Sequence, residues 1–111
     1  MNITQLVASD SGSSVPPYRK QKTLTVTTGT TSNAITGFNR AMPPTVKISG
    51  GTLYATYSEL SDIVSSSAVS DAIWEDITTL VTAGSTSTLS AGINGLVLVA
   101  GAADRTIVVS G

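Results

Sequence analysis

Cysteine and histidine are absent from the chain, and only 12% of its 111 residues are charged. Without these two residue types the protein cannot form a disulfide, a thiol nucleophile or the imidazole base of a hydrolase triad. The usual zinc and haem ligands are missing for the same reason. We therefore expect no catalytic residue, no metal site and no cofactor, and we do not expect an enzyme.

Long apolar runs and aromatic residues are also scarce. The opening residues, MNITQLVASDSG, have neither a basic start nor an apolar stretch long enough for a signal peptide or a membrane span. Aromatic residues make up 5% of the chain, and no dense basic stripe is interleaved with them, as is typical of nucleic-acid-binding proteins. These absences predict a soluble, non-secreted product that has neither a membrane nor a nucleic acid as its partner.

Hydroxyl residues dominate what is present: Ser and Thr supply 33 residues, of which 17 are Thr. From Lys22 onward, short Thr- and Val-rich runs alternate with Gly, Pro and Asn, which is typical of strands joined by turns. About eight strands can be counted. We predict an all-β fold: a single β-sandwich, jelly-roll-like or of related topology, over residues 22–111, preceded by an extended N-terminal arm over residues 1–21.

Turn residues predict three hairpins within the sandwich. The predicted pairs are 22–28 with 31–36 across Gly29-Thr30, 45–48 with 53–56 across Gly50-Gly51, and 94–100 with 105–110 across residues 101–104. In the second pair, Ile48 faces Leu53 on a dry side of the ribbon. Trp74 is expected in the core, residues 74–81 and 84–90 are expected as strands, and residues 58–73 as an irregular connection with one helical turn.

The last predicted hairpin is apolar on both faces. Leu96, Leu98, Ile107 and Val109 lie on one side, and Val97, Val99 and Val108 lie on the other. One side packs on the opposite sheet. The second side needs a further cover, which the arm, a neighbouring chain or a third layer could provide.

The arm combines turn formers, SDSGSSVPP, with scattered apolar residues and a basic cluster. The charge of the chain is also uneven, because residues 1–57 carry five bases against one acid, whereas residues 58–111 carry six acids against one base. One interpretation is two solvated regions, and the other is a basic arm that docks on an acidic neighbour. Together with the outer valines, the arm gives the candidate interface residues Ile3, Leu6, Val7, Val15, Arg19, Lys20, Lys22, Val97, Val99 and Val108.

Two further clusters contain residue types that can bind an ion or a sugar. Glu75 and Asp76 are adjacent acids, but adjacent side chains in a strand point to opposite faces and do not converge on one ion or substrate. Tyr54, with Tyr18 and Tyr57, offers a platform on which a sugar could stack. Packing or interface roles are the alternative for these tyrosines.

The layout from Lys22 to Gly111 resembles small phage virion proteins built as β-sandwiches. The resemblance lies in the runs TLTVTTGTTSNAIT and TVKISGGTLYATYS, a Ser-rich stretch that reaches AIWEDI, and the closing NGLVLVAGAADRTIVVSG. Such proteins serve as capsid decoration or cement proteins, head fibres and parts of tail machinery. The resemblance implies a virion protein assembled in the host cytoplasm, and no functional residue is carried over from it.

These observations predict a capsid decoration protein that forms homo-oligomers, with a trimer favoured, and binds the major capsid protein or other virion proteins through its arm and an apolar interface. The alternative is a tail, fibre or head-fibre component that acts as a host-surface or carbohydrate-binding module.

Overall fold

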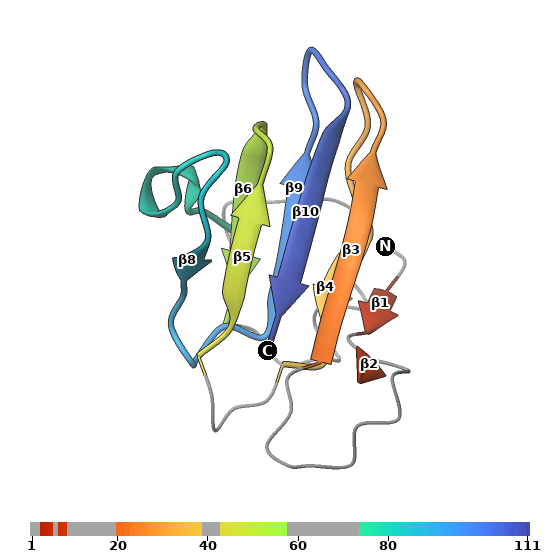
Figure 1. Ribbon diagram of the computed structural model, residues 1–111. Helices are drawn as coiled ribbons and strands as arrows, with labels where there is room; N and C mark the ends of the chain where they lie inside the picture. Colours follow the sequence, from red (N-terminus) through yellow and green to blue (C-terminus); the bar gives the residue numbers. More distant parts are fainter. Residues whose placement is uncertain (1–2, 6, 9–19, 39–42, 58–73) are drawn as a thin grey trace.

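Two β-sheets face each other across a shared core (Figure 1). A computed structural model of the chain describes residues 3–5, 7–8, 20–38, 43–57 and 74–111. Within these residues, sheet A has the strand order β1-β4-β9-β6-β7, and sheet B has the order β2-β3-β10-β5-β8. The predicted all-β sandwich is confirmed. Residues 58–73, expected as an irregular connection, lie outside the described residues.

Most strands are short. Their bounds are β1 Ile3–Gln5, β2 Val7–Ala8, β3 Lys20–Val26, β4 Ala34–Thr36, β5 Thr45–Ile48, β6 Thr52–Thr56, β7 Glu75–Asp76, β8 Ser87–Thr88, β9 Gly95–Val99 and β10 Arg105–Ser110. A single 3-10 turn, η1, covers Thr78–Leu80. The strand expected over residues 74–81 is therefore reduced to β7 followed by η1, and the one expected over 84–90 is reduced to β8.

Strands β3 to β10 follow the jelly-roll order. Numbered one to eight along the chain, they give the order 1-8-3-6 in sheet B and 2-7-4-5 in sheet A. All neighbours within these two groups of four are antiparallel. This double Greek key agrees with the jelly-roll-like fold expected from the sequence.

The pairing in the three predicted hairpins is wrong, although the turns lie where they were expected. β3 and β4, β5 and β6, and β9 and β10 are each divided between the two sheets. Ile48 consequently pairs with Ile107, whereas Leu53 pairs with Leu98. The physical reason is that an arch between sheets and a hairpin within one sheet both turn alternate apolar side chains toward the core. Periodicity therefore predicts the buried face and leaves the hydrogen-bonded partner open.

The core between the sheets is built from alternate apolar residues of the strands, together with Ile77, Leu89, Ile93 and Ala100 from the connections. Its members are Val26, Ile35, Val46, Ile48, Leu53, Ala55, Ile77, Leu89, Ile93, Leu96, Leu98, Ala100, Ile107 and Val109. Leu24, Phe38 and Val81 pack against its margin. Trp74 is buried, as expected, but it does not belong to this cluster.

The described parts of the N-terminal arm are extended and lie on the edges of both sheets. β1 pairs in parallel with β4, so that Thr4 aligns with Ile35. β2 pairs antiparallel with β3, where Val7 aligns with Gln21. β1 and β2 thus place neighbouring parts of the arm on different sheets, next to β4 and β3 on the same side of the sandwich (Figure 1).

The arch between β5 and β6 requires glycine at Gly51. Its φ is +93°, and a Cβ placed there would lie 2.5 Å from the carbonyl oxygen of Val99. Gly29, in the arch between β3 and β4, also has a positive φ, +76°, but a Cβ there would meet nothing within 4 Å. A side chain at Gly29 would therefore add backbone strain alone, whereas one at Gly51 would add backbone strain and a steric clash.

We predict that Gly51→Ala lowers the free energy of unfolding by about 3 kcal/mol, because a strained backbone and a clash with a main-chain atom add together. Gly29→Ala, with the strain alone, should cost about 1 kcal/mol. Urea unfolding of both variants measures the difference. Equal losses would show that the Val99 carbonyl does not constrain this arch.

A hydrogen-bonded latch joins two arches at one end of the sandwich. The backbone N–H and the hydroxyl of Thr28 both donate to Oδ1 of Asp104, at 2.7 and 2.8 Å. The N–H of Gly29 donates to the carbonyl of Gly101 at 2.9 Å. The hydrogen bonds from Thr28 hold the pKa of Asp104 below its usual value.

This latch makes stability depend on pH. Because the pKa of Asp104 is lower in the folded state, its contribution is present above the unfolded value of 3.8 and is lost as the pH falls through the folded value. We predict that Asp104→Asn flattens the fall in unfolding free energy that the parent protein shows below about pH 4. Urea unfolding between pH 2 and pH 6 tests this, and parallel curves for the two proteins would exclude the latch.

Candidate docking surface

The outer face of sheet B is open to solvent and rich in hydroxyl groups. We call the outward-pointing residues of its three central strands, with the residue that follows β5, the sheet B face. They are Gln21, Thr23, Thr25, Thr45, Lys47, Ser49, Thr106, Val108 and Ser110. Val108 and Lys47 occupy the middle of an otherwise hydroxyl-bearing surface. Threonine suits such a place because its β-branched carbon favours a strand while its hydroxyl remains hydrated.

Cross-strand register arranges these side chains in rows. Val108 aligns with Thr23 on one side and with Lys47 on the other. Thr106 aligns with Thr25, and its N–H donates to Oγ of Ser49 at 2.9 Å. Rows repeat every second residue, roughly 6.7 Å apart, and strands lie about 4.8 Å apart, so the face is a regular and rigid grid.

The outer face of sheet A is more deeply buried. Its residues Ala34, Thr36, Thr56 and Val97 are each no more than 1% exposed, and so is Trp74 next to β7. None of them belongs to the cluster between the sheets. Thr52, Tyr54 and Val99 on the same face are half-buried. Among the described residues, the sheet B face is therefore the more open of the two large faces.

The predicted apolar interface is consequently wrong as a single surface. Val97 and Val99 lie on sheet A, whereas Val108 lies on sheet B, because β9 and β10 belong to different sheets. Val97 is 0% exposed and has no surface to offer a partner. Val99 and Val108 are half-buried, and Val108 lies within the sheet B face.

Of the predicted arm residues, Ile3 and Val7 lie in β1 and β2, and Lys20 begins β3. Lys22 is half-buried and aligns with Val109 at one end of sheet B. Leu6, Val15 and Arg19 lie outside the described residues.

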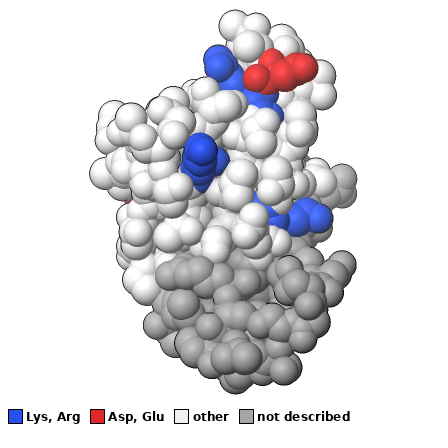
Figure 2. Space-filling view, in the orientation of Figure 1, with Lys and Arg blue, Asp and Glu red and all other residues white. Residues whose placement is uncertain are grey.

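Charge is also distributed unevenly among the described residues. Figure 2 shows basic side chains spread over the view that contains sheet B, with acidic ones confined to the upper end. The bases whose side chains are described are Lys22, Lys47 and Arg105, and the acids are Glu75, Asp76 and Asp104. Glu75 and Asp76 lie on β7, at the edge of sheet A. The sheet B face is thus weakly cationic, which suits an acidic partner.

Glu75 and Asp76 do not form an ion site. Oδ1 of Asp76 accepts a hydrogen bond from the N–H of Thr78 at 2.9 Å, which lowers the pKa of Asp76 and fixes its carboxylate on η1. Within the described ranges, no three acidic, histidine or cysteine residues come together as metal ligands. Nor do these ranges include a helix of the length and hydropathy that crossing a membrane requires.

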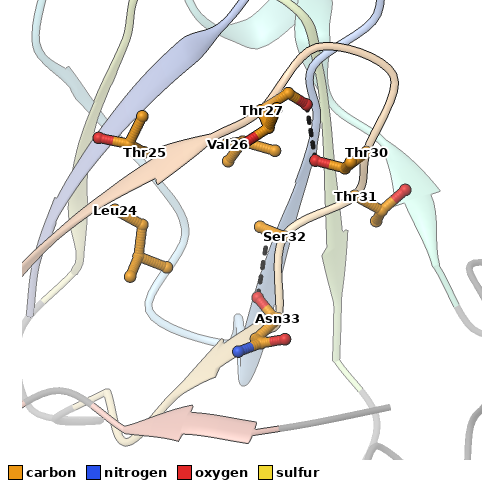
Figure 3. A pocket seen from close by; sticks show the side chains of 8 residues that line it. All are labelled: Leu24, Thr25, Val26, Thr27, Thr30, Thr31, Ser32 and Asn33. Atoms are coloured by element: carbon orange, nitrogen blue, oxygen red, sulfur yellow. Dashed lines mark hydrogen bonds between the residues drawn. The ribbon is translucent and has the colours of Figure 1, made fainter.

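A polar notch opens beside β3, at the side of the sandwich (Figure 3). It has a volume of about 200 Å³ and is lined by Leu24, Thr25, Val26, Thr27, Thr30, Thr31, Ser32 and Asn33. Two of the hydroxyls are engaged: that of Thr30 donates to the carbonyl of Thr27, and that of Ser32 donates to the carbonyl of Asn33. The lining contains no aromatic ring on which a sugar could stack.

The tyrosine platform does not form among the described residues. Tyr54 is half-buried and aligns with Val97 and Asp76 within sheet A. Tyr57 is 52% exposed, and its ring lies against Gly92. Tyr18 lies outside the described residues.

The contrast between the two sheets can be tested with matched valines. Val97→Asp should lower the free energy of unfolding by about 3 kcal/mol or more, because it buries a carboxylate without a partner. Val108→Asp should cost less than about 1 kcal/mol, because the side chain can reach water beside Lys47. Chemical unfolding of both variants measures the two losses, and a larger loss at Val108 would contradict the assignment of the more deeply buried face.

Comparisons with known proteins add no relative. No protein-family model matches the chain, and neither a curated protein nor a solved structure is significantly similar to it. The resemblance to small phage virion proteins therefore remains a hypothesis that rests on strand layout and composition.

Proposed function

We propose that the protein is a structural component of a phage virion, a capsid decoration protein that oligomerises, with a trimer favoured, and stabilises the shell. The sheet B face rests on the major capsid protein or on another virion protein. The observation that carries this proposal is the asymmetry of the sandwich: most of the described outer face of sheet A is buried, whereas most of the sheet B face is exposed.

An exposed strand grid suits attachment to a large partner. Most of its side chains are short or β-branched, so little conformational entropy is lost when they are ordered at an interface. Hydroxyls can exchange water for polar groups of the partner. Such a surface provides specific but modest affinity for each copy.

Repetition turns modest affinity into mechanical support. A decoration protein that touches adjacent capsomers, or that oligomerises over them, binds through several contacts at once. Because it binds only the closed shell, its binding free energy adds to the stability of that state. The described strands of the arm, β1 and β2, lie on the edges of the two sheets, and β2 supplies a further segment beside β3.

The alternative, a carbohydrate-binding module of a tail or fibre, has weaker support. Tyr54 is half-buried instead of forming an open platform. The notch beside β3 has room for a small polar ligand, but no aromatic side chain lines it. Sugar sites usually combine hydrogen-bonding groups with an aromatic face.

The experiment places negative charge on the proposed contact. The double variant Thr23→Glu, Thr25→Glu alters two exposed side chains of the sheet B face on β3. We predict that it binds particles lacking the protein at least tenfold more weakly than the parent, and that its effect is largest at low salt. Co-sedimentation with such particles measures binding, and the rupture temperature of the loaded particles measures cementing.

The matched control is Ala102→Glu, Ala103→Glu, which adds the same charge at exposed positions of the arch between β9 and β10, outside the sheet B face. It should bind and stabilise the particles as the parent does. If particles rupture at the same temperature with and without the parent protein, cementing is not its role. If both double variants bind equally well, the sheet B face is not the contact.

A further inference from the structure

Leu80 is the most exposed large apolar side chain in the described ranges. It is 66% exposed at the end of η1, whereas the next, Tyr57, is 52% exposed. An apolar side chain projecting this far into water costs hydration free energy unless something covers it. A single exposed leucine needs no explanation by itself, so a second observation has to point to what covers it.

The short turn that carries Leu80 is held firmly. The Thr78 hydroxyl accepts a hydrogen bond from the N–H of Leu53 at 2.9 Å, while the N–H of Thr78 donates to Asp76. The N–H of Leu80 donates to the carbonyl of Ile77, which is buried in the core. Leu80 is thus a fixed projection, with the carboxylates of Glu75 and Asp76 on the adjoining strand.

The second observation is a hollow on the sheet B face. It has a volume of about 250 Å³ and is lined by Lys47, Ile48, Ser49, Gly84, Thr106 and Val108. Cavities of about 150 Å³ already accept a benzene molecule, so a leucine side chain fits this one with room to spare. Gly84 contributes a wall without a side chain, and Lys47 contributes a positive charge.

We propose that the hollow receives Leu80 of a second copy of this chain. The two parts match in chemistry, because an apolar projection accompanied by two carboxylates meets an apolar hollow accompanied by an ammonium group. Leu80 does not fill the hollow of its own chain, although Gly84 follows it by only four residues, since it remains 66% exposed. Both halves of the contact are encoded in one sequence, which favours self-association over a foreign partner.

Each copy offers one Leu80 and receives one when the contacts close, so no projection and no hollow is left over. This deepens the proposed function and rests on it in one respect: a decoration trimer needs a subunit interface, and the contact supplies one. The hollow lies on the β5 side of sheet B, and Thr23 and Thr25 on β3 remain free for the shell.

Self-association of the purified full chain tests the contact. Sedimentation equilibrium over a range of protein concentrations should show reversible association of the parent. Leu80→Ser should raise the dissociation constant about tenfold or more, since it removes most of a buried apolar side chain. Tyr57→Ser, which removes the other exposed large side chain, should leave the dissociation constant unchanged. Circular dichroism verifies that each variant is folded.

A complementation experiment makes the test specific. Thr106→Phe fills the hollow but keeps Leu80, and Leu80→Ser keeps the hollow. Each variant alone should be monomeric at concentrations where the parent associates. Mixed together, they should form a one-to-one complex, because one intact projection meets one intact hollow.

The proposal is overturned if the parent is monomeric at millimolar concentration, if Leu80→Ser associates as the parent does, or if the mixture stays monomeric. Lys47→Glu should weaken the association. The double variant Lys47→Glu, Glu75→Lys, in which the two charges are exchanged, should recover at least part of the parent's affinity. Binding of monomers to particles, measured with the sheet B face variants, is independent of these outcomes. A failed subunit contact and a failed docking surface are therefore distinguishable.

Discussion

The structure depends on side-chain packing between strands that follow each other in the chain but lie in opposite sheets. β3 and β4, β5 and β6, and β9 and β10 are joined by arches, so each strand takes its hydrogen-bonded partners from distant parts of the sequence. Leu98 pairs with Leu53, and Ile107 pairs with Leu24 and Ile48. Such a fold closes only when most of its non-local contacts form together, which predicts slow and cooperative folding. The latch between Thr28 and Asp104 ties two of the arches at one end.

In this arrangement the two sheets differ in how much of their surface is exposed to solvent. Most of the described part of sheet A is buried, and β9, with its run of Leu and Val, passes through its middle. Sheet B packs one side against the core and turns Thr23, Thr25 and Thr106 to water. A small chain with little charge thus carries a large ordered surface. We infer that this surface, and not a cleft, is where the protein does its work.

The sequence predicted the fold class, the arches' turns and the alternation of buried residues, because each depends on local pattern. It did not predict strand pairing. In a hairpin Ile48 lies opposite Leu53 in one sheet, and in an arch the two residues face each other across the core. Both arrangements need the same alternation of apolar residues. That error merged Val97, Val99 and Val108 into one imagined surface. The threonines of KQKTLTVTT could have indicated the sheet B face. No local pattern reports, however, that the outer face of sheet A is more deeply buried than that of sheet B. The hollow that receives Leu80 joins residues from β5, β10 and residue 84, and only the tertiary fold brings these together.

The central claim is that the sheet B face is covered on the assembled particle. The chain has no cysteine, so a single Thr23→Cys substitution gives one thiol at a defined place on that face, and Ala102→Cys gives a reference thiol outside it. The measurement is the rate of thiol labelling on the free protein and on the native particle. We predict that Cys at position 23 is labelled rapidly in the free protein and at least tenfold more slowly on the particle, whereas Cys at position 102 is labelled at similar rates in both. Equal labelling of position 23 in the two states would contradict the account.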